Sequence, residues 1–246
     1  MRCLAIGAAL LALSLTACGP KTEGGGETAG PAGFPRPTAS YVATYKMSDQ
    51  AGGSREMTIY ASGGQMRVEG AMPGANITTA TILDPASSQL ITFRTGADAP
   101  KVAMTLSPDK LGAAGEFFDL NKERPNASVT GSDTVAGERC RVWTIPPATE
   151  GGEAHLVCAT DDGILLRQAK AATPEAPLME AVSVKRGAQE PALFAAPAGY
   201  EIVDYGPCLT LTQNAMAAMR EGKRPDMTKM SDCQALGEKL GGLFGQ

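Results

Sequence analysis

The sequence predicts a mainly β protein of the α+β class, with an antiparallel sheet followed by a C-terminal helical hairpin. Short segments between residues 41 and 205 alternate apolar and polar side chains and are separated by turn residues, which is typical of half-buried strands. No segment of helical period between them is long enough to connect parallel strands, so we expect antiparallel pairing. After Pro207 the apolar period becomes helical.

The alternation defines the expected strands, and Asp161-Asp162-Gly163 is a strong hairpin turn between two of them. The stretch 107–120 is less regular, and a short helix is one assignment for it. The expected strands are 41–47, 56–60, 65–69, 79–83, 89–93, 101–106, 139–145, 154–160, 164–169 and 179–186.

Two capping boxes, Thr210 to Gln213 and Ser231 to Gln234, predict the starts of two C-terminal helices, and Gly222 is expected to end the first. The second helix carries an apolar stripe, which is expected to pack on the sheet; a partner-binding helix is the alternative. The stripe consists of Cys233, Leu236, Leu240 and Leu243.

The N-terminus has the layout of a secretory signal, because Arg2 precedes a short apolar run over residues 4–15 and small residues follow. A short membrane anchor or a buried helix is the alternative. Leu15-Thr16-Ala17-Cys18 resembles the lipobox of bacterial lipoproteins. That resemblance implies cleavage before Cys18 and a lipid on its sulfur. Gly19 stands where an Asp marks inner-membrane retention in enterobacteria, which favours the outer membrane, facing the periplasm.

The chain therefore divides into four expected parts. Residues 1–17 form the signal peptide, and residues 18–40, rich in Gly, Pro, Thr and Ala, form a lipidated flexible tether. Residues 41–206 form the antiparallel β domain. Residues 207–246 form the helical tail packed on it.

Six cysteines are present. By the lipobox resemblance, Cys3 is expected to leave with the signal and Cys18 to carry the lipid. Four cysteines in an exported chain most simply form two disulfides, with three connectivities open. We expect near neighbours to pair, because adjacent antiparallel strands would bring the first pair face to face. A zinc site is the alternative, but CxxC pairs are missing. The expected pairs are Cys140 with Cys158 and Cys208 with Cys233.

The composition argues against several functions. A net charge of −4 and the absence of a basic cluster argue against nucleic-acid binding. No phosphate-binding loop, dinucleotide fingerprint or nucleophile elbow occurs. The single histidine, His155, lies in an expected strand, and the turn acids Asp161 and Asp162 are expected to be solvated. We therefore expect no enzyme activity, no cofactor, and no catalytic or metal-binding residues.

Residues 131–143 and 157–167, together with Phe194 before Pro197-Ala198-Gly199-Tyr200, resemble in cadence the exported bacterial family DUF4412. The region 41–205 is also similar to lipoprotein carriers of the LolA and LppX type. That resemblance implies a curved antiparallel sheet forming an open half-barrel over a helix, and it transfers no catalytic residue.

The resemblance to lipoprotein carriers implies a lipid-anchored envelope lipoprotein that holds an acyl chain or another apolar ligand in a half-barrel. Strands rich in aliphatic residues and poor in aromatic ones agree with this expectation. The alternative function is a non-catalytic structural or interaction protein of the envelope. The expected partners are the membrane, through lipid on Cys18, a hydrophobic ligand, and an envelope protein. A closed core filled by the same aliphatic residues is the competing structural interpretation.

Overall fold

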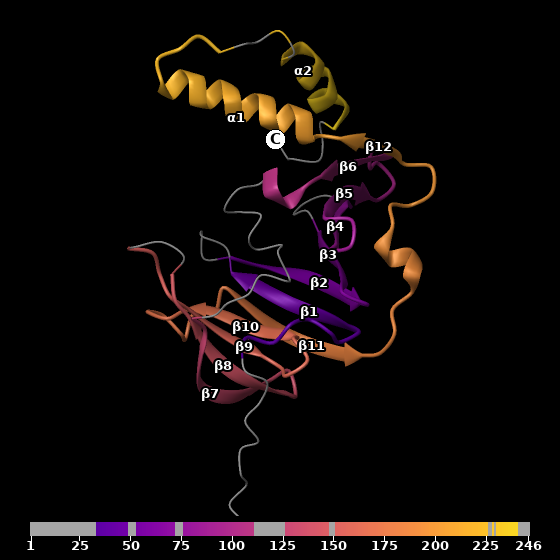
Figure 1. The fold of residues 1–246 in the computed structure, drawn as a ribbon. Coiled ribbons are helices and arrows are strands. Elements are labelled where there is room, and N and C mark those ends of the chain that lie inside the picture. Colours follow the sequence, from indigo (N-terminus) through magenta and orange to yellow (C-terminus); the bar gives the residue numbers. More distant parts are fainter. Residues whose placement is uncertain are drawn as a thin grey trace, which may run out of the picture. The chain divides into compact units, whose positions relative to one another are not determined.

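The computed structural model describes residues 33–48, 53–71, 76–110, 126–147, 151–225, 228 and 230–240. These residues form a twelve-stranded open sheet and two C-terminal helices (Figure 1). The predicted fold class, a mainly β sheet with a disulfide-tied helical pair, is thereby confirmed. The elements are β1 (Tyr41–Ser48), β2 (Ser54–Ser62), β3 (Gln65–Ala71), β4 (Thr78–Asp84), β5 (Gln89–Thr95), β6 (Val102–Leu106), β7 (Ser128–Val135), β8 (Glu138–Ile145), β9 (His155–Ala159), β10 (Leu165–Lys170), β11 (Met179–Arg186), the 3₁₀ helix η2 (Pro191–Phe194), β12 (Glu201–Asp204), α1 (Gly206–Arg220) and α2 (Met230–Lys239).

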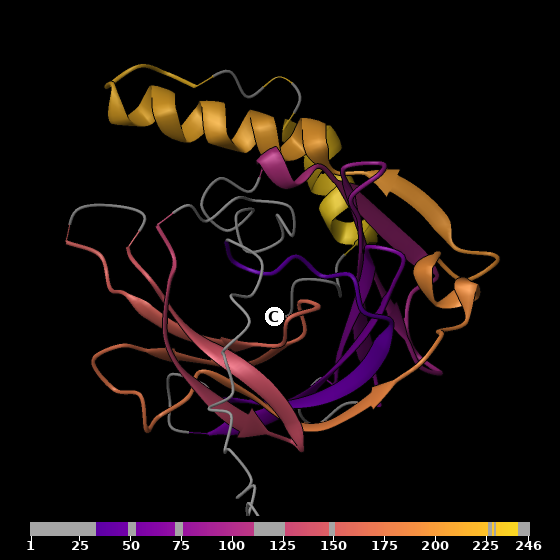
Figure 2. The same cartoon turned by 60° about the horizontal axis from the view of Figure 1, so that its bottom comes forward.

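Two antiparallel meanders make up the sheet, whose order is β12-β6-β5-β4-β3-β2-β1-β11-β10-β9-β8-β7. Strands β1 to β6 follow one another as neighbours, and so do β7 to β11. Pairing of β1 with β11 joins the two meanders. Strand β7 also contacts β11, although three strands separate them in the sheet, so the second meander curls strongly (Figure 2).

β12 departs from the antiparallel prediction. It pairs with β6 in parallel, with Glu201 opposite Val102, and is the only parallel neighbour among the described strands. The chain leaves β11 in the middle of the sheet and crosses by way of η2, which contacts β3 and β4, before reaching the far edge. This crossing sets the direction of β12. The sequence analysis missed both β12 and β7, because neither carries a clear apolar alternation.

The strand register defines two faces of the sheet, because directly opposed residues point to the same side. We call the inner face the side that carries Tyr41, Ala43 and Tyr45 of β1. From these three residues, rows of opposed side chains run across the first meander. The first row is Tyr41, Ala61, Met66, Leu83, Leu90 and Leu106; the second is Ala43, Ile59, Val68, Thr81, Thr92 and Met104; the third is Tyr45, Met57, Gly70, Thr79 and Arg94.

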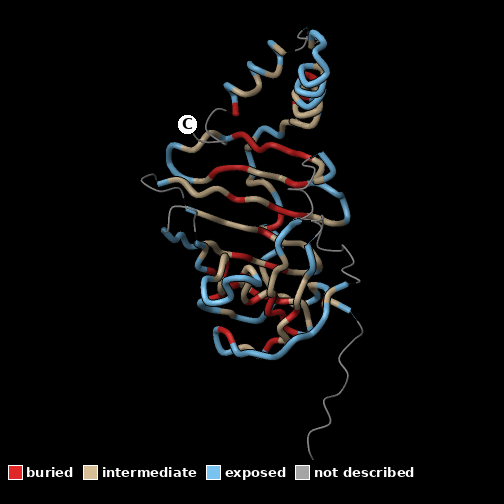
Figure 3. Tube along the Cα trace, turned by 90° about the vertical axis from the view of Figure 1, so that its left-hand side faces the viewer, coloured by how far each residue is buried: buried red, intermediate tan, exposed pale blue. Residues whose placement is uncertain are grey.

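The main core lies on the inner face where the second meander curls over β1 and β2. Tyr45 is completely buried there, and its hydroxyl donates a hydrogen bond of 2.9 Å to the Leu165 carbonyl. Burial raises the pKa of the Tyr41 hydroxyl to about 12, since the charged phenolate would be desolvated. Buried residues follow the strands, whereas the helices are mostly exposed or half-buried (Figure 3). The core comprises Tyr41, Ala43, Tyr45, Ile59, Ala61, Val135, Cys140, Cys158, Ile164, Leu166, Met179 and Ala181.

On the outer face, the segment around η2 covers β3 to β5. Phe194 packs with Ala80, Ile82, Phe93 and Ala103 in a separate cluster. The buried Arg67 points to this face, because it lies opposite Ile82. The crossing segment therefore gives the first meander an outer packing layer.

The helices differ from the capping-box predictions. α1 begins at Gly206 rather than after Thr210, because Pro207 occupies its first turn, where a missing N–H is tolerated. It ends before Gly222, whose φ of +70° suits a helix terminus. α2 begins at Met230, one residue before the predicted capping box.

α2 covers the inner face beside β6 and β12. Leu240, directly after α2, is completely buried and packs with Leu236 against Val102 and Met104. Leu243, the last residue of the predicted stripe, lies outside the described residues. In the part of the chain that the structure describes, neither helix has the length and apolar character needed to cross a membrane.

Residues 33–40, which the sequence analysis assigned to a flexible tether, pack on the second meander instead. The backbone N–H groups of Thr38 and Ala39 donate to the Asp162 carbonyl at 2.9 and 3.2 Å. Phe34 meets Trp143 edge-to-face with ring centroids 5.5 Å apart. We call residues 33–40 the strap. The aromatic contact and these hydrogen bonds escaped the sequence analysis because they link segments more than a hundred residues apart.

Gly163 lets the strap approach the β9–β10 turn. A Cβ on Gly163, which has φ of +87°, would lie 2.2 Å from the Arg36 carbonyl oxygen. Gly137 in the β7–β8 turn has a similar φ of +82°, but a Cβ there would meet nothing within 4 Å. Ala substitutions at the two glycines therefore share the cost of backbone strain, but only a substitution at Gly163 also excludes the strap.

We predict that Gly163→Ala destabilises the protein by at least about 1 kcal/mol more than Gly137→Ala. Both variants place Ala at a positive φ, but only Gly163→Ala displaces the strap. Urea denaturation followed by circular dichroism measures the difference, and proteolysis within 33–40 should accelerate only in Gly163→Ala. Equal losses in the two variants would contradict this packing.

Candidate functional site

The structure joins the four cysteines of the folded region in two disulfides. Cys140 on β8 bridges Cys158 on β9 with Cα atoms 5.5 Å apart, and Cys208 bridges Cys233 with Cα atoms 5.4 Å apart. The first bridge lies in the main core; the second ties α1 to α2. Cys18, the predicted lipidation site, lies outside the described residues. Two disulfides favour an oxidising compartment such as the periplasm.

Among the described residues, the groups considered for catalysis are not assembled into an active site. His155 is half-buried on β9, and its Nδ1 lies 3.4 Å from Nε2 of Gln168. Asp161 forms an ion pair of 2.7 Å with Arg141, while Asp162 pairs with Arg186. The described residues contain no cluster of His, Cys, Asp and Glu able to hold a metal ion.

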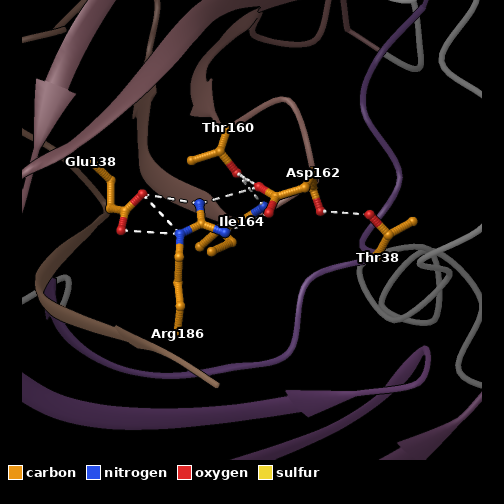
Figure 4. A network of polar contacts seen from close by, with 6 residues as sticks. All are labelled: Thr38, Glu138, Thr160, Asp162, Ile164 and Arg186. Carbon is orange, nitrogen blue, oxygen red and sulfur yellow. Dashed lines mark hydrogen bonds and ion pairs between the residues drawn. The ribbon is translucent and has the colours of Figure 1, made fainter. Parts of the chain in front are cut away.

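Asp162 is the centre of a polar network rather than a solvated turn residue (Figure 4). Arg186, at the end of β11, donates to Asp162 and also to Glu138 at 2.9 Å. The Thr160 hydroxyl donates to Asp162 at 2.6 Å and accepts from the backbone N–H of Ile164 at 2.9 Å. The network links the β9–β10 turn to β8 and β11, so its arrangement indicates a structural role.

The charges in this network shift the acidity of Asp162. The hydrogen bond from Arg186, followed by that from Thr160, lowers the pKa of the Asp162 carboxyl below its usual range, since both favour the ionised form. No local sequence pattern predicts this network, because Glu138, Asp162 and Arg186 lie in three separate segments.

The surface with a chemical character suited to a ligand is the inner face of β3 to β6. Apart from Arg94, its side chains are aliphatic residues, methionines and threonines; several are half-buried, and Met66 and Val68 also pack against the main core. Leu83, Leu90 and Leu106 are buried, yet none of them belongs to the four core clusters formed by described residues. The apolar face of the first meander thus extends beyond the described cores.

Arg94 is the one cation among the described residues of that face. It lies opposite Thr79 in the third row, and only 5 % of its surface is exposed. Its Nε atom is buried without a hydrogen-bond partner. The strand predicted from the sequence ends at Phe93 and leaves out Arg94, although the alternation of Arg94 with Leu90 and Thr92 was a usable signal.

A pocket lies where β6 ends and α1 begins. Leu106 belongs both to its wall and to the first row of the inner face, so the pocket adjoins one end of that row. The rest of its wall is mostly polar. It is lined by Gln89, Thr105, Leu106, Ser107, Lys110, Asp204, Gly206, Pro207 and Thr210.

Comparison with known proteins gives fold-level similarities to solved structures. An uncharacterised conserved protein from Thermus thermophilus is 14 % identical over 68 % of this chain and 91 % of that chain, with a TM-score of 0.45. MucB in the Pseudomonas aeruginosa MucA/MucB complex is 15 % identical over 67 % of this chain, with a TM-score of 0.42, and the match spans 58 % of the MucB chain. PNGF-II is 11 % identical over 70 % of this chain and 32 % of that chain, with a TM-score of 0.43.

No protein-family model and no curated protein matches the sequence. The DUF4412 resemblance therefore stays a prediction. Similarities at this level of identity say nothing about what this chain binds, so its function has to be argued from its own residues.

We predict that Asp162→Asn destabilises the protein by about 1 to 2 kcal/mol near pH 7, because it weakens charge-assisted hydrogen bonds in a partly exposed network. A lowered folded-state pKa stabilises the protein above the unfolded-state pKa, and this contribution is lost as pH falls through the folded value. The difference from wild type should therefore shrink towards about pH 2.5. Urea denaturation at both pH values measures it.

Asp161→Asn is the matched control for this prediction. The Asp161 side chain is 75 % exposed in its ion pair with Arg141, so its loss should change stability by less than about 1 kcal/mol. A larger effect at Asp161 than at Asp162 would contradict the structural role given to the network.

Proposed function

We propose that this chain is a lipid-anchored protein of the bacterial envelope that binds an acyl chain or a similar apolar ligand on the inner face of β3 to β6. The observation that carries the proposal is the continuous apolar row from Met66 through Leu83 and Leu90 to Leu106. Burial of such a chain would contribute about 0.8 kcal/mol per methylene. Aliphatic side chains and methionines adapt to a flexible chain, whereas sugar sites rely on aromatic platforms.

The N-terminal sequence supports the location that the proposal gives to the protein. The lipobox-like segment ending at Cys18 would place two or more acyl chains on the mature N-terminus, enough for stable anchoring. By the same resemblance, Gly19 favours the outer membrane. Residues between Cys18 and the strap would hold the domain at the membrane surface, where apolar ligands are found.

Native mass spectrometry on a Cys18→Ala chain, exported to the periplasm and purified without detergent, tests ligand binding. We expect bound mass that organic extraction removes and that is identified as lipid. A clean apo mass that stays unchanged after incubation with envelope lipids would contradict the proposal.

The location of the ligand is tested with two neighbouring residues of β3. Met66 points to the inner face and Gln65 lies next to it on the opposite side, and both are half-buried. Because Met66 also packs against the main core, the melting temperature of each variant is measured alongside. In folded protein, Met66→Lys should reduce lipid occupancy at least about tenfold, because a charge would enter an apolar binding surface. Gln65→Lys should leave occupancy unchanged. Equal occupancy in both variants would place the ligand elsewhere.

A second candidate function, docking of an envelope protein, is favoured by the exposed methionines of α1. Met216 is 43 % exposed and Met219 is 57 % exposed, which is unusual for apolar side chains of this size. Deletion of residues 207–246 would be a poor test, because it removes the buried Leu240 from the core beside β6.

The double variant Met216→Ser with Met219→Ser tests docking more cleanly. If α1 docks a protein, in-cell crosslinking should recover a specific partner with the wild type and lose it with the variant, while the melting temperature stays unchanged. The single variant Asn214→Ser, at an exposed polar position of the same helix, is the control. Equal recovery of the partner with wild type and variant would contradict this function.

A further inference from the structure

We infer that Arg94 binds the anionic headgroup of the apolar ligand, so that the ligand class is an acyl chain ending in a carboxylate or a phosphate. This inference rests on the proposed function. Arg94 continues the inner face at the third row, on the same strand and the same side as Leu90 and Thr92. A ligand lying along β5 would therefore pass from aliphatic side chains to a guanidinium.

Arg94 is buried without a compensating charge among the described residues. A guanidinium taken out of water loses its hydration and is retained in folded proteins when an anion or several acceptors replace the water. Arg94 is only 5 % exposed, and its buried Nε has no hydrogen-bond partner. Among the described residues, no carboxylate forms an ion pair with it. Its opposed neighbour, Thr79, offers no charge.

Arg67 shows how the same sheet satisfies a buried arginine that needs no ligand. Arg67 is 7 % exposed and points to the outer face, on the strand next to β4. Its guanidinium donates to Glu69 at 2.5 and 2.8 Å and to the Leu193 carbonyl at 2.9 Å, and it lies 5.2 Å from the Phe93 ring centroid. Each of these contacts compensates desolvation. Both arginines are buried, but among the described residues only Arg67 has a carboxylate partner.

The geometry of the face fits a ligand with one charged end. Leu90 and Arg94 are four residues apart on one side of β5, a separation of about 13 Å along the strand. The first row, at the Leu90 end, is entirely apolar from Met66 to Leu106. An acyl chain would contact this row while its carboxylate or phosphate accepts hydrogen bonds from Arg94. Guanidinium groups favour such oxoanions because they donate two parallel hydrogen bonds.

The inference predicts headgroup selectivity in the wild type, without any substitution. Palmitate, 1-palmitoyl lysophosphatidate, hexadecanol and methyl palmitate share a sixteen-carbon chain or acyl group but differ in charge. Binding to the delipidated Cys18→Ala chain is measured by displacement of a fluorescent fatty acid near pH 8. We expect at least one of the two anionic ligands to bind tenfold or more tightly than both uncharged ligands. The tighter of the two anions distinguishes a free fatty acid from a phospholipid as the source.

Substitution of Arg94 tests whether this residue causes the selectivity. Arg94→Gln should bring the anionic ligand to the affinity of hexadecanol, and Arg94→Lys should retain part of the preference. Arg67→Gln is the matched control, because it alters an equally buried arginine on the opposite face and should leave the preference intact. Melting temperatures of all variants report any general loss of folding.

The possible outcomes test the proposed function and the role of Arg94 separately. If none of the four ligands binds, the proposed function is wrong. If charged and uncharged ligands bind equally, or if Arg94→Gln and Arg94→Lys both keep the full preference, the apolar site stands and the role of Arg94 is overturned. If Arg94→Gln lowers the melting temperature of the ligand-free protein but keeps the preference, the guanidinium is paired within the chain and the inference is likewise overturned.

Discussion

The pairing of β1 with β11 is the constraint on which the rest of the structure depends. β1 is hydrogen-bonded to β2 on one side and to β11 on the other, so among the described strands it alone joins the two meanders. Its alternate residues Tyr41, Ala43 and Tyr45 are buried between them and begin the rows of the inner face. A one-residue slip of β1 would exchange the inner and outer faces of the first meander. Arg186 secures this junction at its end through Asp162 and Glu138.

The two halves of the sheet use the same face in different ways. In the second meander, the curl of β7 to β11, the Cys140–Cys158 bridge and the buried tyrosines close the inner face into a core. In the first meander, the outer face is covered by the η2 segment, and among the described residues α2 covers the inner face beside β6 and β12. The apolar first row and the buried Arg94 on the same face are the reason to look for a ligand on the inner face of β3 to β6.

Elements whose signal is local in the sequence were predicted. The alternation of apolar and polar residues gave ten of the strands, and Gly222 gave the end of α1, because each depends on neighbouring residues. Prediction failed where distant segments decide the outcome. β12 follows β6 in parallel because of the crossing over β3 and β4, and α1 starts at Gly206 because Pro207 fits its first turn. The strap, assigned to a tether by composition, is held by Asp162 and Trp143.

By itself, the sequence determined which residues alternate, where turns and helices occur, and which cysteines could lie close together, since all of these depend on short separations along the chain. The prediction of a lipid on Cys18 also rests on the sequence alone. Only the tertiary structure decided the strand order, the identity of the inner face and the difference between Arg67 and Arg94. Both arginines look alike in the sequence. Their environments differ because strand register assigns each side chain to one face and to a set of distant neighbours. The inner face itself is fixed at the β1–β11 junction, where the register brings Tyr41 opposite Arg186.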